Sequence, residues 1–216
     1  MTTQTDSTRD HILTTGRALV AQRGFTGMGL AELLKTAAVP KGSFYHYFAS
    51  KEDFGCKLLE QYLSQYGETL TEILEDSAPT ARARLLEYWS RWVSSQSSQE
   101  ACSQCLIVKL GAEVSDISNE MRHLLEAGTR TVSRRLARTI AEGQKDGSIA
   151  ASVQPDLVGP ALYQMWLGAS LMAKLSRSAD PLLQAMEATL ALLPEPHPEP
   201  KQTPPTHRKP NATNRR

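Results

Sequence analysis

Apolar residues recur along this chain at the three- and four-residue spacing of helices, and no stretch alternates apolar and polar residues as a half-buried strand does. The longest such series follows Ser50, a capping residue, and contains Phe54, Leu58, Leu59, Tyr62, Leu63, Tyr66, Leu70, Ile73 and Leu74. Prolines that suit the first turn of a helix open later segments, at Pro79, Pro155 and Pro181. The pattern predicts an all-α fold of about nine helices.

Two very short helices with a tight turn between them are predicted within residues 24–52. The first is marked by one apolar face, consisting of Leu30, Leu33, Leu34 and Ala37. Pro40 ends it, because a proline disfavours the helical conformation in the residue before it. The second, 41–47, has Phe44 and Phe48 on a side that can anchor it. A two-turn helix is not stable alone, so we expect a recognition element held against a core. The alternative is a surface hairpin whose aromatic residues only fill that core.

The other side of the second short helix carries a lysine, a glycine that leaves the backbone accessible, and three side chains that end in polar groups. These residues are Lys41, Gly42, Ser43, Tyr45 and His46. The run 39–52, VPKGSFYHYFASKE, resembles the TetR family of bacterial transcriptional regulators, whose recognition helix runs into a Tyr–Phe pair and then Lys-Glu. The resemblance implies that these five residues read the major groove or bind phosphates of double-stranded operator DNA, and that Lys51 neutralises a phosphate.

One position departs from the family pattern. Many TetR members carry Thr-Ser or Thr-Thr at the start of the first short helix, where a hydroxyl caps the helix and touches a phosphate. Here Met28 and Gly29 occupy those positions. We therefore expect a backbone N–H to take over that contact.

Charge is distributed unevenly along the 216 residues, although the whole-chain net charge is only +1. Residues 1–51 hold six basic and three acidic side chains, whereas 52–193 hold thirteen basic and eighteen acidic ones. A basic end beside an acidic body is typical of a DNA-reading module attached to a regulatory one. The sequence shows no pattern of a signal peptide or of a membrane span, so no membrane partner is predicted. Three cysteines are too few for a disulfide framework, and we therefore predict a cytoplasmic chain.

The chain divides into a head, a body and a tail. We predict a DNA-binding domain over 6–66, with its helix-turn-helix at about 29–48 and a first helix ending near Gly24. A sensing and dimerisation domain is predicted over 67–193, reached through a long connecting helix from Ser50 to about residue 76. Residues 194–216 are rich in proline and basic residues and are predicted to be disordered.

The predicted body helices start near residues 79, 103, 118, 155 and 181, and the polar segment 94–100 is predicted to be a loop. The last two helices have more apolar surface than one subunit needs. Small residues on the first of these two, at Gly159, Ala161, Gly168 and Ala169, favour close approach of another helix. In the TetR family the corresponding pair forms the homodimer interface; the alternative is the core of a monomer.

The cysteine pair Cys102 and Cys105 lies at a predicted helix start, where the helix N-terminus lowers the pKa of a thiol. Zinc requires four ligands, and neither Cys56 nor His123 has the usual spacing to complete a site, so no metal is predicted. A thiol oxidoreductase would place this motif beside strands, so we predict neither an enzyme nor a cofactor. A buried structural cysteine remains the simplest alternative.

Two further blocks, 105–114 and 166–178, resemble a TetR subgroup of repressors that respond to electrophiles and reactive chlorine. That resemblance implies that Cys105 is the sensor of a small reactive electrophile or oxidant, with Lys174 close to it. Cys102 is a possible resolving thiol. A related TetR group instead binds a small unsaturated acid such as acrylate reversibly, and Trp89, Trp92, Tyr163 and Trp166 are candidates for lining that pocket, with Lys174 meeting the carboxylate.

Overall fold

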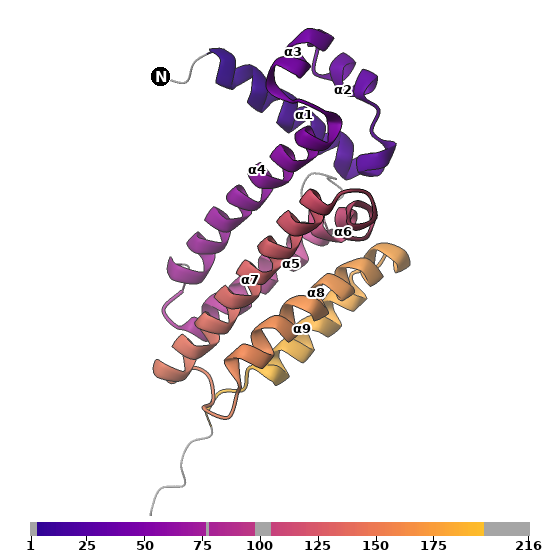
Figure 1. The fold of residues 1–216 in the computed structure, drawn as a ribbon. Helices are drawn as coiled ribbons and strands as arrows, with labels where there is room; N and C mark the ends of the chain where they lie inside the picture. Colours follow the sequence, from indigo (N-terminus) through magenta and orange to yellow (C-terminus); the bar gives the residue numbers. More distant parts are fainter. Residues whose placement is uncertain (1–3, 77, 98–104, 197–216) are drawn as a thin grey trace, which may run out of the picture.

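The computed structural model describes residues 4–76, 78–97 and 105–196, which form nine α-helices and one π-helical turn (Figure 1). The elements are α1 (Gln4–Gly27), α2 (Leu30–Thr36), α3 (Lys41–Tyr47), α4 (Lys51–Thr71), η1 (Glu72–Asp76), α5 (Ala81–Ser97), α6 (Leu106–Ile117), α7 (Asn119–Lys145), α8 (Pro155–Ser176) and α9 (Asp180–Leu192). Every regular element in these ranges is helical, which confirms the predicted all-α fold.

The head consists of α1, α2 and α3, and an aromatic cluster joins it to the first turns of α4. Phe44, Phe48 and Phe54 are all buried, and their ring centroids lie 5.1 to 5.7 Å apart. The side chain of Ser50 caps α4 by accepting a hydrogen bond from the N–H of Asp53 at 3.0 Å. The two short helices therefore owe their position to this shared core, as the sequence pattern predicted.

The connecting helix α4 leaves the head and runs along the body (Figure 1). Its regular α-helix ends at Thr71, and the predicted remainder forms the π-helical turn η1. Within the body, α7 packs against α4, α5, α6 and α8, while α9 packs against α8. Gly159 permits close packing of α8 on α7, because a Cβ there would lie 2.7 Å from the backbone nitrogen of Ala137. Gly168 has no such neighbour within 4 Å.

Two predicted irregular segments differ in the structure. The loop predicted over 94–100 is wrong for 94–97, because α5 continues to Ser97. The hydroxyls of Ser94 and Ser95 donate to carbonyls of the preceding helical turn, so these polar residues remain compatible with the helix. The first residues of the predicted disordered tail are ordered: the carbonyl of Pro194 accepts a hydrogen bond from the N–H of Ala150, and Glu195 forms an ion pair with Arg82 at 3.0 Å, while residues 197–216 lie outside the described ranges.

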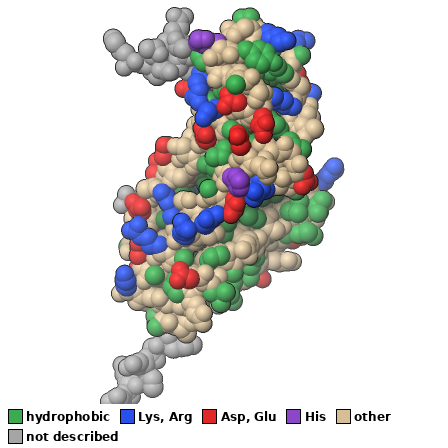
Figure 2. Space-filling model, viewed as in Figure 1, with side chains coloured by type: hydrophobic (Ala, Val, Ile, Leu, Met, Phe, Trp, Pro, Cys, Tyr) green, Lys and Arg blue, Asp and Glu red, His purple; other side chains and the backbone are tan. Residues whose placement is uncertain are grey.

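Helices α8 and α9 expose large apolar side chains. These are Leu157, Leu171, Met172 and Leu175 on α8 and Leu183, Leu190 and Leu192 on α9, between 39% and 69% exposed. Figure 2 shows apolar side chains gathered where these two helices meet, at the right of the body. Among the described helices, none is long and apolar enough to cross a membrane.

Candidate DNA-binding head and thiol sensor

The short helix α3 exposes the residues that sequence analysis assigned to DNA binding. Lys41, Gly42, Tyr45 and His46 are exposed and Ser43 is half-buried, whereas Phe44 on the opposite side is fully buried. The ammonium group of Lys41 lies 5.8 Å from the ring centroid of Tyr45. Figure 2 shows Lys and Arg side chains at this upper end of the molecule. The arrangement presents hydroxyl, imidazole and ammonium groups on one outward-facing surface.

Lys51 begins α4 beside the end of α1. Its ammonium group lies 5.0 Å from the ring centroid of Phe25 and donates to the carbonyl of Thr26 at 3.5 Å. Partial burial lowers the pKa of Lys51, and the charge of Glu113 opposes this shift. At the start of α2, Met28 is buried and the N-cap Gly29 has no side-chain capping bond, so backbone groups remain available there.

Cys105 occupies the N-cap position of α6 and is buried. The hydroxyl of Tyr62, on α4, donates a hydrogen bond to its sulfur at 3.6 Å. Burial raises the pKa of the Cys105 thiol, although hydrogen bonds from the backbone of Val108 and Ile107 and from Tyr62 oppose the shift. The prediction of a lowered pKa is therefore wrong for this state. The helix N-terminus acts in the expected direction, but desolvation of the charged form outweighs it.

Four tyrosine hydroxyl groups interact electrostatically with this thiol, and these residues, Tyr62, Tyr66, Tyr88 and Tyr163, are called the phenol group below. Cys105 contributes to raising the pKa of Tyr62, Tyr66, Tyr88 and Tyr163, each of which is raised mainly by burial. Tyr66 and Tyr88 share a hydrogen bond, whereas the buried hydroxyl of Tyr163 and the indole N–H of Trp89 have no partner among the described residues. Sequence analysis missed the first three tyrosines. The available signal was their placement in the apolar stripes of α4 and α5.

Of the two residues predicted to cooperate with Cys105, only Lys174 lies within the described ranges. Lys174, near the end of α8, is exposed, and its pKa is lowered by partial burial and by the charge of Lys109. Within the described ranges, no hydrogen bond joins Lys174 to Cys105. Cys102 falls among the residues 98–104 that the structure does not describe.

The four aromatic residues predicted to line a ligand pocket are packed against one another in the body core. The rings of Trp89 and Trp166 stack 4.7 Å apart, and Tyr163 lies edge-on to Trp92 at 6.0 Å. The indole N–H groups of Trp92 and Trp166 donate to Ser170 and Thr189. A ligand at this position would have to displace part of this packing.

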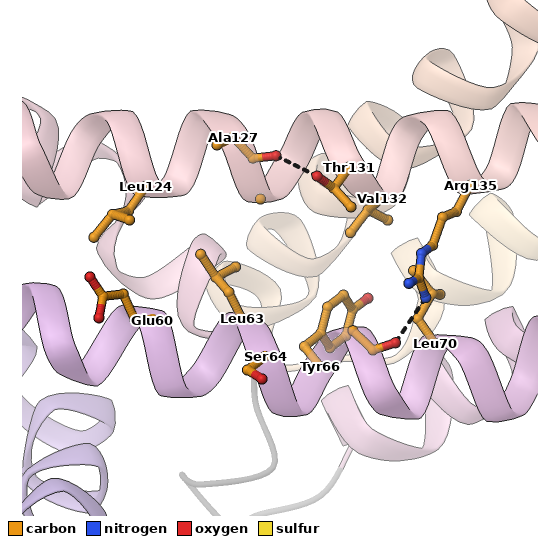
Figure 3. Close-up of a pocket in the computed structure, with 12 residues that line it drawn as sticks. Glu60, Leu63, Ser64, Tyr66, Leu70, Leu124, Ala127, Thr131, Val132 and Arg135 are labelled. Carbon is orange, nitrogen blue, oxygen red and sulfur yellow. Dashed lines mark hydrogen bonds between the residues drawn. The ribbon is translucent and has the colours of Figure 1, made fainter.

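A cleft of about 350 Å³ lies instead between α4 and α7, with an almost wholly apolar lining (Figure 3). Arg135 crosses it and donates to the carbonyl of Gly67 at 2.8 Å. Gly128 borders the same space, and a Cβ there would lie 2.5 Å from the Leu63 side chain. Tyr66 lines the cleft and also belongs to the phenol group around Cys105.

Two family models match the chain. The model described as "Bacterial regulatory proteins, tetR family" matches residues 12–54, and "Tetracyclin repressor-like, C-terminal domain" matches residues 81–189. The chain belongs to the TetR family. The predicted family resemblance is thus confirmed, and the second match covers half of the sequence.

Two named transcriptional regulators are similar to this chain over most of its length. The HTH-type transcriptional repressor NemR of Escherichia coli K12 is 46% identical over 179 residues, covering 83% of this chain and 90% of NemR. The transcriptional regulator AcuR of Cereibacter sphaeroides is 35% identical over 174 residues, covering 79% of this chain and 78% of AcuR.

Solved structures agree with this assignment. The crystal structure of the reduced form of E. coli NemR aligns with a TM-score of 0.84 at 46% identity, covering 88% of this chain and 98% of the other. A cysteine mutant of the TetR-family regulator CifR, complexed with 26 bp of operator DNA, aligns with a TM-score of 0.75 at 28% identity, covering 86% and 97%. The TetR architecture therefore extends over both head and body.

Proposed function

We propose that this protein is a TetR-type transcriptional repressor that releases its operator when Cys105 is modified by an electrophile or an oxidant. The observation that carries the proposal is the position of Cys105, at the N-cap of α6 within the phenol group. Helix α6 packs against α1 of the head, so a change at this thiol acts on the element that contacts the head. The similarity to NemR, solved in a form named as reduced, supports the same assignment.

Helix α3 is the proposed recognition helix. Its exposed residues, Lys41, Gly42, Ser43, Tyr45 and His46, are suited to contacts with base edges and phosphates. Lys51 adds a phosphate contact from the start of α4, where the free N–H groups of the helix also favour an anion. The DNA complex of the neighbouring CifR supports this use of the fold.

The sensing chemistry begins with loss of the thiol proton, because the thiolate is the nucleophile. With an unsaturated carbonyl compound, sulfur forms a bond to the β-carbon while the π electrons move towards the α-carbon, which then takes up a proton. The adduct adds bulk at the buried N-terminus of α6. With hypochlorous acid, the thiolate sulfur forms a bond to chlorine as hydroxide leaves, and water then displaces chloride to give a sulfenic acid, a polar group at the same place. Both changes disfavour the packing of the reduced protein.

Lys174 and Cys102 are proposed as secondary partners. The lowered pKa of Lys174 increases the fraction of neutral amine, the form able to bond to the sulfur of a Cys105 sulfenic acid with loss of water. Cys102 precedes Cys105 by three residues and is a candidate for closing a disulfide.

The protein is proposed to act as a homodimer through α8 and α9. Their exposed leucines and methionine form an apolar surface that a second copy would cover. A two-fold dimer would place two α3 helices on half-sites about one helical turn of DNA apart, ~34–36 Å.

A reversible unsaturated acid is the second candidate inducer. It is favoured by the 35% identity to AcuR and by the unpartnered hydroxyl of Tyr163 and N–H of Trp89, which a polar ligand would satisfy. Trp92, Trp166 and Lys174 would then contribute to the same site.

Operator binding with and without N-ethylmaleimide or hypochlorite tests the proposal. We expect release of DNA together with modification of Cys105 by mass spectrometry, and recovery by thiol reductant after hypochlorite. An unmodified Cys105 in the released protein would rule out the sensor. Cys105→Ser should lose the electrophile response but keep a response to acrylate if the second candidate is correct.

A further inference from the structure

Glu113, on α6, reaches from the body into the head. Its Oε2 atom accepts a hydrogen bond from the N–H of Phe25 at 3.1 Å, and its Oε1 atom accepts one from the N–H of Thr26. The two donors lie at the end of α1, 88 and 87 residues earlier in the chain. One carboxylate therefore holds two consecutive backbone amides across the junction.

The backbone of Gly24 makes this contact possible. Its φ of 80° and ψ of 170° interrupt the helical conformation of α1, in a region that essentially only glycine occupies. A Cβ at this position would lie 2.7 Å from Oε2 of Glu113. The interruption turns the following amides towards the carboxylate, and the absent side chain leaves space for it.

The carboxylate is ionised and bordered by two lysines. Partial burial raises the pKa of Glu113, but hydrogen bonds from Thr26 and Phe25 and the charge of Lys109 together outweigh it, so the net shift is downward. Lys109, one turn earlier on α6, donates to the carbonyl of Gln22 at 3.4 Å. On the head side, Glu113 is an electrostatic neighbour of Lys51.

Cys105, Lys109 and Glu113 follow one another at four-residue spacing at the start of and along α6. The carbonyl of Cys105 accepts the hydrogen bond of the Lys109 N–H at 3.3 Å. Glu113 follows Cys105 by eight residues, which corresponds to roughly 12 Å along a helix axis. The carboxylate thus connects α6, which Cys105 precedes, to the Phe25–Thr26 backbone. Lys51 contacts the same two residues, through the ring of Phe25 and the carbonyl of Thr26.

We propose that Glu113 is a positioning residue that couples the state of Cys105 to the DNA-binding head. Seated on the amides of Phe25 and Thr26, it fixes the end of α1 relative to α6 in the reduced protein. A shift of α6 after modification of Cys105 withdraws the carboxylate, which frees the end of α1 and changes the environment of Lys51. This inference rests on the proposed thiol-sensing function.

Operator affinity of the full-length Glu113→Gln variant tests the coupling. The dissociation constant is measured before and after complete modification with N-ethylmaleimide, and the ratio of the two values is the readout. A glutamine places an NH₂ group against one of the two amides, so we expect the ratio to fall at least tenfold below that of the wild type. Glu87→Gln, which removes an exposed carboxylate from α5, is the matched control and should keep the wild-type ratio.

Glu113→Asp separates the contact from its charge and serves if the glutamine variant does not fold. Aspartate keeps the charge but lacks the length to reach both amides, so the ratio should again fall, and hydrogen exchange at Phe25 and Thr26 should quicken. A wild-type ratio of dissociation constants in either folded variant would overturn the proposed role of Glu113 but would leave thiol sensing intact. A wild-type ratio near one would contradict thiol sensing itself, and the coupling with it.

Discussion

The hydroxyl of Tyr62 donates a hydrogen bond to the sulfur of Cys105 at 3.6 Å, and this contact joins α4 to the first residue before α6. Helix α4 begins beside the head and α6 packs against α1, so each of the two residues lies on or next to a helix that contacts the head. A chemical change at the sulfur must alter this contact, because the donor then faces a bulkier or more polar group.

Removing the Tyr62 hydroxyl should slow modification of Cys105. The phenol stabilises the thiolate by a hydrogen bond, so Tyr62→Phe should reduce the rate with N-ethylmaleimide roughly three- to tenfold. Mass spectrometry of the Cys105 peptide over time measures this rate. Tyr45→Phe removes a phenol from the exposed surface of the head and is the control. An unchanged rate in Tyr62→Phe would show that this bond does not activate the thiol.

Modification of Cys105 should accelerate with pH. Because burial holds the pKa of this thiol above its ordinary value, the thiolate is a minor form near neutrality and increases about tenfold per pH unit. We expect the N-ethylmaleimide rate to rise with nearly that slope between about pH 6.5 and 8.5. A rate that levels off near pH 7 would indicate a low pKa and contradict the buried, protonated thiol.

Cys56 should not act as the sensor. Burial, followed by the charges of Glu120 and neighbouring acidic groups, raises the pKa of Cys56 to about 11, so little thiolate is present at neutral pH. Cys56→Ser should therefore retain release of the operator by hypochlorite, whereas Cys105→Ser should lose it. Gel-shift titrations of both variants make the comparison. Loss of the hypochlorite response in Cys56→Ser would show that Cys56 is the sensor.

The Lys41→Ala, Tyr45→Ala double variant should lose operator binding while remaining folded. Both side chains are exposed on α3, and loss of such contacts costs about 1–3 kcal/mol each, which together lowers the affinity at least about thirtyfold. Thermal unfolding should change little, because neither side chain belongs to the core. Lys145→Ala removes a cation from the far end of α7 and should bind normally. Normal binding by the double variant would contradict the assignment of α3.

Leu175→Glu should dissociate the homodimer. Leu175 is 69% exposed on α8, and in a two-fold interface the substitution places two carboxylates against apolar surface. Sedimentation should show a shift to monomer and gel shifts a weaker complex. Ile117→Glu introduces the same charge at the exposed end of α6, away from α8 and α9, and should remain dimeric. A dimeric Leu175→Glu variant would place the interface elsewhere.

The helices of the head could be predicted from residues that lie close together in the sequence. The spacing of Leu30, Leu33 and Ala37, the stop at Pro40 and the opposed faces of α3 are local properties, because helix periodicity and proline geometry act over a few residues. The capping of α4 by Ser50 is of the same kind. The sequence pattern predicts the end of α5 too early, because serine hydroxyls hydrogen-bond to helix carbonyls as well as to loop backbone.

By itself, the sequence determined the all-α class, the exposed polar surface of α3 and the placement of Cys105 at a helix start, since each follows from local pattern. Tertiary structure decided what surrounds that thiol. Burial among tyrosines from α4, α5 and α8 raises its pKa against the local effect of the helix N-terminus. Tertiary structure also brought Glu113 onto the amides of Phe25 and Thr26, a contact between residues far apart in the chain that no helical spacing encodes.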